Sequence, residues 1–232
     1  MSSSRPCRCK AMGSEANASF PPPGVDAAGL RPDPSDMLRI IAGQYKSRHL
    51  LSPPGKEQSR PYSQRLKESV FNILRGHVED ANVLDLFAGV GTVGLEAVSR
   101  GAKMVLMVEQ DRRIHELLTR NVEALACEDN VDVLHGDALG SVSLLRAPRP
   151  LHIVFCDPPY KLMDTPEGRA RVFAQLSRAA PLLAENGLVV LRTPVDPTAI
   201  DHSIEGLDGP EVRSHRRGHE TLFYAPLASG AS

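Results

Sequence analysis

The fold is decided by the stretch Val83-Leu-Asp-Leu-Phe-Ala-Gly-Val-Gly-Thr-Val-Gly94. Its apolar beginning is typical of a buried strand, and its glycines match the pattern G-x-G-x-x-G at Gly89, Gly91 and Gly94. Between a strand and a helix, this pattern lets the backbone approach a ligand closely. Glu109 follows at the end of the next apolar run, where a carboxylate can accept hydrogen bonds from ribose hydroxyls. The pattern alone indicates either a dinucleotide site or an S-adenosylmethionine site.

Outward from this stretch, apolar runs alternate with amphipathic segments. We expect strands at 83–87, 104–108, 131–134, 152–156 and 188–191, and helices at 92–100, 111–125, 139–145 and 168–183. Such alternation predicts an α/β fold with a doubly wound, mostly parallel sheet that binds ligands at the carboxyl ends of its strands. Segments 212–215 and 221–224 indicate a terminal antiparallel strand pair. Residues 38–51 and the apolar stripe over 65–75 indicate an N-terminal β-hairpin plus helix.

Composition narrows the class of protein. Of the 232 residues, 41% are hydrophobic and 24% are charged, as in ordinary globular domains. No apolar run approaches the roughly 18 residues of a membrane-spanning helix, so an integral membrane protein is excluded. Four scattered cysteines are too few for a disulfide framework or a four-ligand zinc site. We therefore expect a cytoplasmic protein without a metal.

Charge and composition also divide the chain. Residues 1–37 are rich in Pro, Ser and Gly and are expected to be a disordered tail, although an organellar transit peptide or a start at Met37 stays open. Residues 38–78 carry eight basic side chains against two acidic ones. Such a segment is a plausible footprint for a polyanion such as RNA. Residues 79–226 form the expected catalytic body, and 227–232 a short tail.

Two acidic residues favour S-adenosylmethionine over a dinucleotide. Asp85 is expected to be buried four residues before the first glycine, where it would repel a pyrophosphate but suit a cationic ligand. Asp137 follows the third strand and can accept a hydrogen bond from an adenine amino group. Capping a helix is the simpler alternative for Asp137.

The motif Asp157-Pro-Pro-Tyr160 follows the fourth apolar run directly. Because Pro158 disfavours helical backbone in the preceding residue, Asp157 is expected to stay extended at the strand end. Proline has no N–H, so the motif presents carbonyl and carboxylate acceptors without competing donors. Those acceptors suit an exocyclic amino group, and Tyr160 offers a ring on which a splayed base can stack. The sequence therefore predicts methylation of an amine here.

Together these residues resemble the class I S-adenosylmethionine-dependent methyltransferases with the [DN]-P-P-[YF] signature. Other stretches extend the likeness to the bacterial RsmD family over roughly residues 38–225: Leu38-Arg-Ile-Ile-Ala-Gly-Gln-Tyr-Lys-Ser-Arg48, Arg65-Leu-Lys-Glu-Ser-Val-Phe-Asn72 and Leu84-Asp-Leu-Phe-Ala-Gly89. One departure lies just before the first helix. There Tyr62 and Gln64 replace the Thr and Asp usual in that family.

The resemblance implies a Rossmann-like class I methyltransferase fold, S-adenosylmethionine as cofactor, and methyl transfer to N2 of a guanine in small-subunit (16S-type) ribosomal RNA. It also implies a partly assembled small ribosomal subunit as partner. The implied cofactor-binding residues are Asp85, Phe87, Ala88, Gly89, Gly91, Glu109, Asp137 and Ala138. The implied catalytic residues are Asp157, Pro158, Pro159 and Tyr160.

The basic segment is predicted to hold the RNA backbone. The side chains expected to do so are Arg39, Lys46, Arg48, Arg60, Arg65 and Lys67. Two other functions stay open at this point. A DNA adenine-N6 methyltransferase shares the Asp-Pro-Pro-Tyr motif but usually needs a recognition domain, and a non-catalytic RNA-binding protein explains the basic segment but not the cofactor motif. A nicotinamide-dependent oxidoreductase explains the glycines but neither Asp85 nor Asp157.

Overall fold

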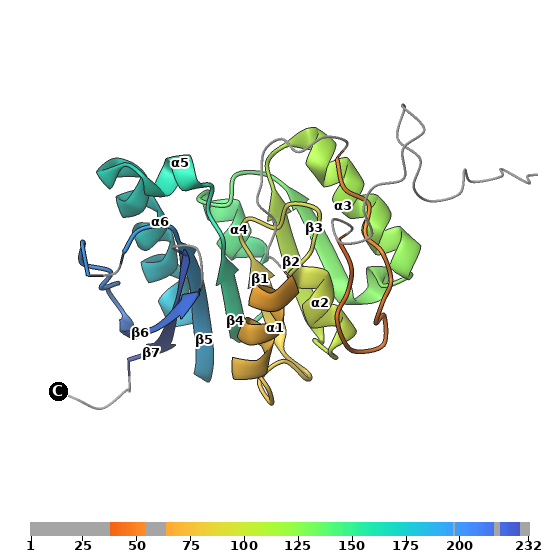
Figure 1. The fold of residues 1–232 in the computed structure, drawn as a ribbon, viewed down its shortest axis with the longest axis horizontal. Helices are drawn as coiled ribbons and strands as arrows, with labels where there is room; N and C mark the ends of the chain where they lie inside the picture. Colours follow the sequence, from red (N-terminus) through yellow and green to blue (C-terminus); the bar gives the residue numbers. More distant parts are fainter. Residues whose placement is uncertain (1–37, 54–63, 197, 216–218, 228–232) are drawn as a thin grey trace, which may run out of the picture. The chain divides into compact units, whose positions relative to one another are not determined.

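The computed structural model describes residues 38–53, 64–196, 198–215 and 219–227. Its framework is a seven-stranded mixed sheet with the order β3-β2-β1-β4-β5-β7-β6 (Figure 1). The strands are β1 (Asn82–Asp85), β2 (Met104–Glu109), β3 (Val131–His135), β4 (Leu151–Cys156), β5 (Leu183–Thr193), β6 (Leu207–His215) and β7 (His219–Pro226). The first five run parallel, and β7 is antiparallel to both β5 and β6. The predicted doubly wound sheet with a terminal antiparallel pair is confirmed.

Helices cover both faces of this sheet. They are α1 (Gln64–Ile73), α2 (Gly94–Ser99), α3 (Arg112–Leu125), α4 (Ser141–Arg146), α5 (Tyr160–Met163) and α6 (Pro166–Ala179), with 3-10 turns η1 (Glu128–Asn130) and η2 (Ala180–Leu182). The core shared with α1, α2 and α3 contains Val83 and Val105, whereas the core shared with α4 and α6 contains Leu84 and Leu106. Successive strand residues thus point to opposite faces, and both faces are buried. This is why the strands read as continuous apolar runs.

Local sequence signals set the ends of α3. The Asp111 carboxylate caps the helix by accepting from the backbone N–H groups of Arg113 at 2.8 Å and Ile114 at 3.2 Å. The helix ends at Ala126, which has the left-handed backbone of a helix C-cap (φ 51°). No helix in the part of the chain that the structure describes is long and apolar enough to cross a membrane.

Segment 38–51 forms the expected hairpin, although its pairing is short. Arg39 and His49 form an antiparallel bridge, and the N–H groups of Ile40 and Leu50 donate to the carbonyls of Arg48 at 3.0 Å and Leu38 at 2.8 Å. The hairpin backbone also donates to α2, where Glu96 and Ser99 act as acceptors. The donors are the N–H groups of Ile41, Ala42, Gln44 and Tyr45. These contacts attach the turn of the hairpin to α2.

Several boundaries in the second half differ from the predictions. Helix α6 ends at Ala179 and η2 follows, so β5 begins at Leu183 rather than at residue 188. Strand β6 begins at Leu207 rather than at residue 212. Helix α5 was not expected. The predicted tail at 1–37 lies outside the described residues, as does the C-terminal tail beyond Leu227.

Candidate functional site

Parallel strands bring four acidic residues to one edge of the sheet. Asp85 ends β1 and Glu109 ends β2, while Asp137 and Asp157 follow β3 and β4 by two residues and one residue. These strands are neighbours in the order β3-β2-β1-β4, so their carboxyl ends meet. Helix α5 begins at the same edge, because it follows β4 after only three residues (Figure 1). The sheet thus gathers the sequence motifs into one site.

Glu109 fixes the backbone of the glycine-rich loop by hydrogen bonds. One carboxylate oxygen of Glu109 accepts from the backbone N–H of Gly89 at 3.0 Å, and the other accepts from that of Asp111 at 2.8 Å. Gly89 has a left-handed backbone (φ 56°), and a Cβ added there would meet no atom within 4 Å. The loop therefore leaves open space beside its backbone, as a ligand-binding loop requires.

Asp85 lies next to the first residue of α2 and is 3% exposed. Its Oδ2 accepts from the backbone N–H of Gly94 at 3.0 Å. A Cβ on Gly94 would lie 2.4 Å from the Met107 sulfur, so a larger residue there would require the Met107 side chain to shift. Burial, reinforced by the nearby Asp157 carboxylate, raises the pKa of Asp85 to about 7. A positively charged ligand in the site would therefore interact favourably with the Asp85 carboxylate.

A cavity of about 330 Å³ opens at this edge of the sheet. Its lining residues are Phe87, Gln110, Asp137, Leu139, Pro159, Lys161, Leu162 and Arg171. Phe87, Asp137 and Pro159 were expected at the site, and the other five were not. Asp137 Oδ1 accepts from the backbone N–H of Leu139 at 2.9 Å, and the carboxylate lies 3.7 Å from Arg171. Asp137 therefore shapes its own loop and still borders the cavity.

The neighbouring Ala138 is 4% exposed. Its carbonyl accepts from Gln175 Nε2 at 2.9 Å and from Ser143 Oγ at 3.1 Å. These contacts bind the loop after β3 to α4 and α6. The wall of the cavity is thus fixed by hydrogen bonds from two helices.

The Asp157-Pro-Pro-Tyr160 motif crosses from β4 to α5. Asp157 Oδ1 accepts from Arg192 Nε at 2.5 Å, and the Arg192 guanidinium lies 5.8 Å from the centre of the Tyr160 ring. Burial raises the pKa of Asp157 to about 6, although Arg192 opposes that rise. Pro158 is buried, whereas Pro159 is exposed and borders the cavity.

Arg192 was not among the predicted site residues. It lies on β5, the strand next to β4, and it is 6% exposed. The sequence carried one signal of it, a charged residue at the carboxyl end of the apolar run Leu188–Leu191. Its relevance depends on the β4–β5 pairing, which aligns Cys156 with Leu191 and so brings the following residues together.

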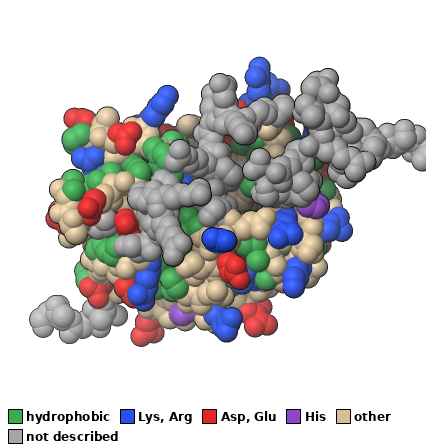
Figure 2. Space-filling view, viewed as in Figure 1, with side chains coloured by type: hydrophobic (Ala, Val, Ile, Leu, Met, Phe, Trp, Pro, Cys, Tyr) green, Lys and Arg blue, Asp and Glu red, His purple; other side chains and the backbone are tan. Residues whose placement is uncertain are grey.

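Four of the predicted RNA-binding residues are exposed: Arg39, Lys46, Arg48 and Arg65. Arg60 lies outside the described residues. Figure 2 shows Lys and Arg side chains gathered over segment 38–51 and α3. Arg48 links these two parts, because its guanidinium donates to the carbonyl of Ala124 at 2.9 Å.

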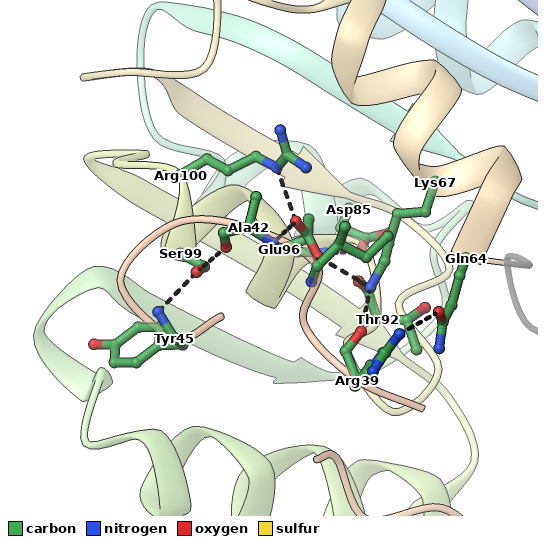
Figure 3. A network of polar contacts seen from close by, with 12 residues as sticks. Arg39, Ala42, Tyr45, Gln64, Lys67, Asp85, Thr92, Glu96, Ser99 and Arg100 are labelled. Atoms are coloured by element: carbon green, nitrogen blue, oxygen red, sulfur yellow. Dashed lines mark hydrogen bonds and ion pairs between the residues drawn. The ribbon is translucent and has the colours of Figure 1, made fainter. Parts of the chain in front are cut away.

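The assignment of Lys67 to this RNA-binding set is wrong. Lys67 is 2% exposed, and its Nζ donates to the carbonyls of Arg39 at 2.9 Å and Thr92 at 3.2 Å (Figure 3). It also forms an ion pair with Glu96 at 3.1 Å. Segment 38–51 packs over the face of α1 that periodicity alone assigns to solvent. Lys67 therefore connects α1, the glycine-rich loop and segment 38–51 through buried contacts.

The site fits S-adenosylmethionine chemically. A cavity of this size falls at the lower end of the range for small-molecule sites, roughly 300–1,000 Å³. Asp85, Glu109 and Asp157 lie close enough for their charges to affect one another, so the site favours a cationic ligand. Phe87 and Leu139 offer apolar surface to an adenine ring, and the open backbone at Gly89 admits close contact.

Comparisons with known proteins agree with this geometry. A family model described as conserved hypothetical protein 95 matches residues 38–224. The ribosomal RNA small subunit methyltransferase D of Escherichia coli K12 is 39% identical over 129 residues, which cover 55% of this chain. The match spans 62% of that relative's own length, less than two thirds. The candidate rRNA methyltransferase YlbH of Bacillus subtilis is 30% identical over 154 residues, which are 66% of this chain and 80% of that protein.

Solved structures resemble the fold over its full core. The methyltransferase candidate yhhF from Escherichia coli superposes with a TM-score of 0.68 at 29% identity, and the match covers 82% of this chain and 98% of that one. The methylase candidate HI0767 from Haemophilus influenzae has a TM-score of 0.62 at 27% identity, with coverage of 82% and 99%. Sequence and structure therefore indicate the same family.

Proposed function

The chain belongs to the RsmD-type methyltransferase family, and from that premise we propose that it transfers a methyl group from S-adenosylmethionine to the exocyclic N2 of a guanine in small-subunit ribosomal RNA. The observation that carries this proposal is the position of Asp157-Pro-Pro-Tyr160. The motif lies at the end of β4 and borders the cavity through Pro159. It thus presents acceptors for an amino group beside a site that suits the cofactor.

The acceptors are needed because an exocyclic amine is a poor nucleophile. Its lone pair is delocalised into the heterocycle, so it attacks only when the nitrogen becomes pyramidal. The Asp157 carboxylate and the Pro158 carbonyl can each accept from one N–H of the amine, which favours that shape. Tyr160 offers its ring to the base, a contact worth about 1–3 kcal/mol. Positioning and electrostatics then provide most of the catalysis.

The reaction balances without a metal or a redox partner. When bound, S-adenosylmethionine supplies a methyl group on a positively charged sulfur that an amine nitrogen can displace. A nitrogen–carbon bond forms, a carbon–sulfur bond breaks, and the methylated nitrogen must then release one proton. Asp157 is ionised above about pH 6 and can take that proton, either directly or through water.

The basic segment supports RNA as the substrate. Arg39, Lys46, Arg48 and Arg65 are exposed on segment 38–51 and α1, and we infer that they hold the phosphate backbone. Glu96 attaches segment 38–51 to α2 through two backbone N–H groups, so the basic surface keeps a fixed position relative to the cofactor loop. Such a short segment has little capacity to read bases. We therefore infer that a partly assembled small subunit supplies the shape that selects the guanine.

The test is transfer of labelled methyl groups from S-adenosylmethionine to three acceptors. These are small ribosomal subunits that lack the modification, free small-subunit RNA, and duplex DNA. We expect label on guanine N2 of the RNA, strongest with subunits. Label on DNA adenine alone would favour the DNA methyltransferase, and no label on any acceptor would refute the proposal.

The Asp157→Ala variant tests the residue assignment. We expect transfer to fall by at least about 100-fold, the usual effect of losing one aligned acceptor or proton acceptor. Cofactor binding should survive, because the glycine-rich loop and Glu109 are unchanged. The matched control is Asp132→Ala, which removes a partly exposed carboxylate on β3 that pairs with Arg146 on α4. Equal activity in both variants would contradict a role for Asp157.

A further inference from the structure

Arg192 is a charged residue in a strand that is otherwise apolar near its end. Val189, Val190 and Leu191 are fully buried, and the Arg192 side chain is only 7% exposed. A buried guanidinium is costly unless it is paired. Asp157 is one such partner, at 2.5 Å between Nε and Oδ1, and the same guanidinium lies 5.8 Å from the centre of the Tyr160 ring. Arg192 thus contacts both ends of the Asp-Pro-Pro-Tyr motif.

We infer that Arg192 is a positioning residue for methyl transfer: it holds Oδ1 of Asp157 so that Oδ2 faces the amine as an acceptor. This inference rests on the proposed function. It follows from the geometry, because a carboxylate fixed at one oxygen by a buried guanidinium has its orientation set. An Asp157 free to rotate would offer the amine no fixed acceptor.

The stability of the fold does not account for this pair. Buried ion pairs contribute little net stability, and apolar residues of similar volume often replace them without loss. The strand needs no charge here, since the residues before Arg192 pack in the sheet as apolar side chains. The ion pair with Asp157, the acidic residue of the methylation motif, gives a charge at this position a role in the chemistry.

Arg192 also sets the charge on Asp157. The ionisable groups whose charges couple to this carboxyl lie on three strands: Arg192 on β5, Asp85 on β1 and Cys156 on β4. Burial raises the pKa of Asp157, and Arg192 lowers it. Asp85 is a second carboxyl and disfavours ionisation, while burial raises the pKa of the Cys156 thiol so that it carries no charge.

Without Arg192, a larger fraction of Asp157 would therefore hold a proton at neutral pH. A protonated carboxyl has an O–H that donates, and it accepts less well than a carboxylate. It also cannot take the proton that the methylated nitrogen must release. Arg192 thus keeps Asp157 in the only state that suits an amine substrate.

The experiment compares Arg192→Met and Arg192→Lys with the wild-type chain. The first readout is direct titration of the Asp157 carboxyl carbon by NMR, which needs neither RNA nor cofactor. Loss of an adjacent opposite charge should raise the pKa of Asp157 by about 1–3 units in Arg192→Met. Arg192→Lys keeps the positive charge, so the pKa of Asp157 should stay close to its wild-type value in that variant. An Asp157 pKa that stays unchanged in Arg192→Met would overturn the inference.

The second readout is the pH profile of methyl transfer. In Arg192→Met we expect the acidic limb of kcat to move up by the same 1–3 units, which should lower kcat at pH 7 by about 2-fold to 100-fold. The KM for S-adenosylmethionine should stay within about 3-fold, because the glycine-rich loop is intact. The control is Arg146→Met, which breaks a partly exposed ion pair with Asp132. A lowered kcat with an unmoved pH profile would reduce Arg192 to a structural role.

A double-mutant cycle separates the two proposals. If Arg192 acts through Asp157, the losses in Arg192→Met and Asp157→Asn should be strongly non-additive. Additive losses would overturn the positioning role while leaving the methyltransferase intact. Failure of the wild-type chain to methylate any RNA would instead refute the proposed function, and the NMR titration would still test the pair.

Discussion

Glu96 is the acceptor at the centre of a buried network, and its replacement by Ala should destabilise the chain strongly. The side chain is fully buried, and its two oxygens accept four donors (Figure 3). The donors are the backbone N–H groups of Ile41 at 2.8 Å and Ala42 at 3.0 Å, Arg100 Nε at 2.8 Å and Lys67 Nζ at 3.1 Å. Glu96→Ala would leave all four without this partner at once.

The largest cost comes from Lys67. Breaking a buried ion pair by removing one partner costs about 3–5 kcal/mol, because the remaining charge stays buried. Lys67 is 2% exposed, and burial already lowers its pKa. Loss of a proton caps the cost, since neutralising a lysine with a pKa near 10.5 takes about 5 kcal/mol at pH 7. The two N–H groups on segment 38–51 can reach water if the segment lifts. We therefore expect a total loss of about 3–5 kcal/mol.

The assay is equilibrium unfolding in urea, with the free energy extrapolated to water. The control is Glu116→Ala, which removes an exposed i,i+4 partner of Arg112 and should cost at most about 0.5 kcal/mol. Between pH 7 and pH 9 the loss in Glu96→Ala should shrink. The unfolded chain then binds more protons than a folded chain with neutral Lys67, so the folded state gains as pH rises.

A second variant tests the cause. Glu96→Leu combined with Lys67→Met replaces the pair by apolar side chains of similar volume, and it should recover most of the stability lost in Glu96→Ala. Hydrogen exchange at Ile41 and Ala42 should stay fast in both variants, since neither restores their acceptor. A loss below about 1 kcal/mol in Glu96→Ala, or a double variant no more stable than the single one, would refute the reasoning.

Two further predictions concern pH and RNA. Asp85→Asn should stabilise the chain more at pH 8 than at pH 5. The difference between the two pH values in the free energy of unfolding, measured in urea, should be about 2–3 kcal/mol. Because the pKa of Asp85 is raised to about 7, the wild-type chain loses stability as pH rises from about 4 to about 7, whereas the amide of Asn does not ionise. An equal effect of the substitution at both pH values would contradict this prediction. Charge reversal of Lys46 and Arg48 to Glu should weaken RNA binding and lower the slope of log K against log salt by about 1–2, measured by titration at several salt concentrations. An unchanged slope would exclude these side chains from the RNA contact.

Much of this fold was predictable because the sheet is parallel. A strand buried on both faces reads as an apolar run, and the motif residues then fall at its carboxyl end. Asp85, Glu109 and Asp157 could be placed at one edge of the sheet from the alternation of elements alone. The terminal antiparallel pair was predictable from two short runs around a polar turn. Boundaries near η2 were not, because a helix that ends in a 3-10 turn carries no separate apolar pattern.

The errors come from contacts between distant segments. Periodicity correctly placed the buried residues Leu66 and Val70 on one stripe of α1 and Lys67 beside it. It could not show that segment 38–51 covers that second face, where the carbonyl of Arg39 accepts from Lys67. Arg192 was missed for the same reason, since its importance depends on which strand lies next to β4.

The two buried ion pairs differ in one respect that separates fold from chemistry. Every oxygen of Glu96 is occupied by donors of the chain itself, so the Lys67–Glu96 pair has no capacity left for a substrate. Asp157 is held by Arg192 at Oδ1, and its side chain is still 19% exposed at the carboxyl edge of the parallel strands. A saturated pair fixes the position of a segment. A pair with one oxygen left over fixes the position of an acceptor, which is the arrangement that transfer to an amine requires.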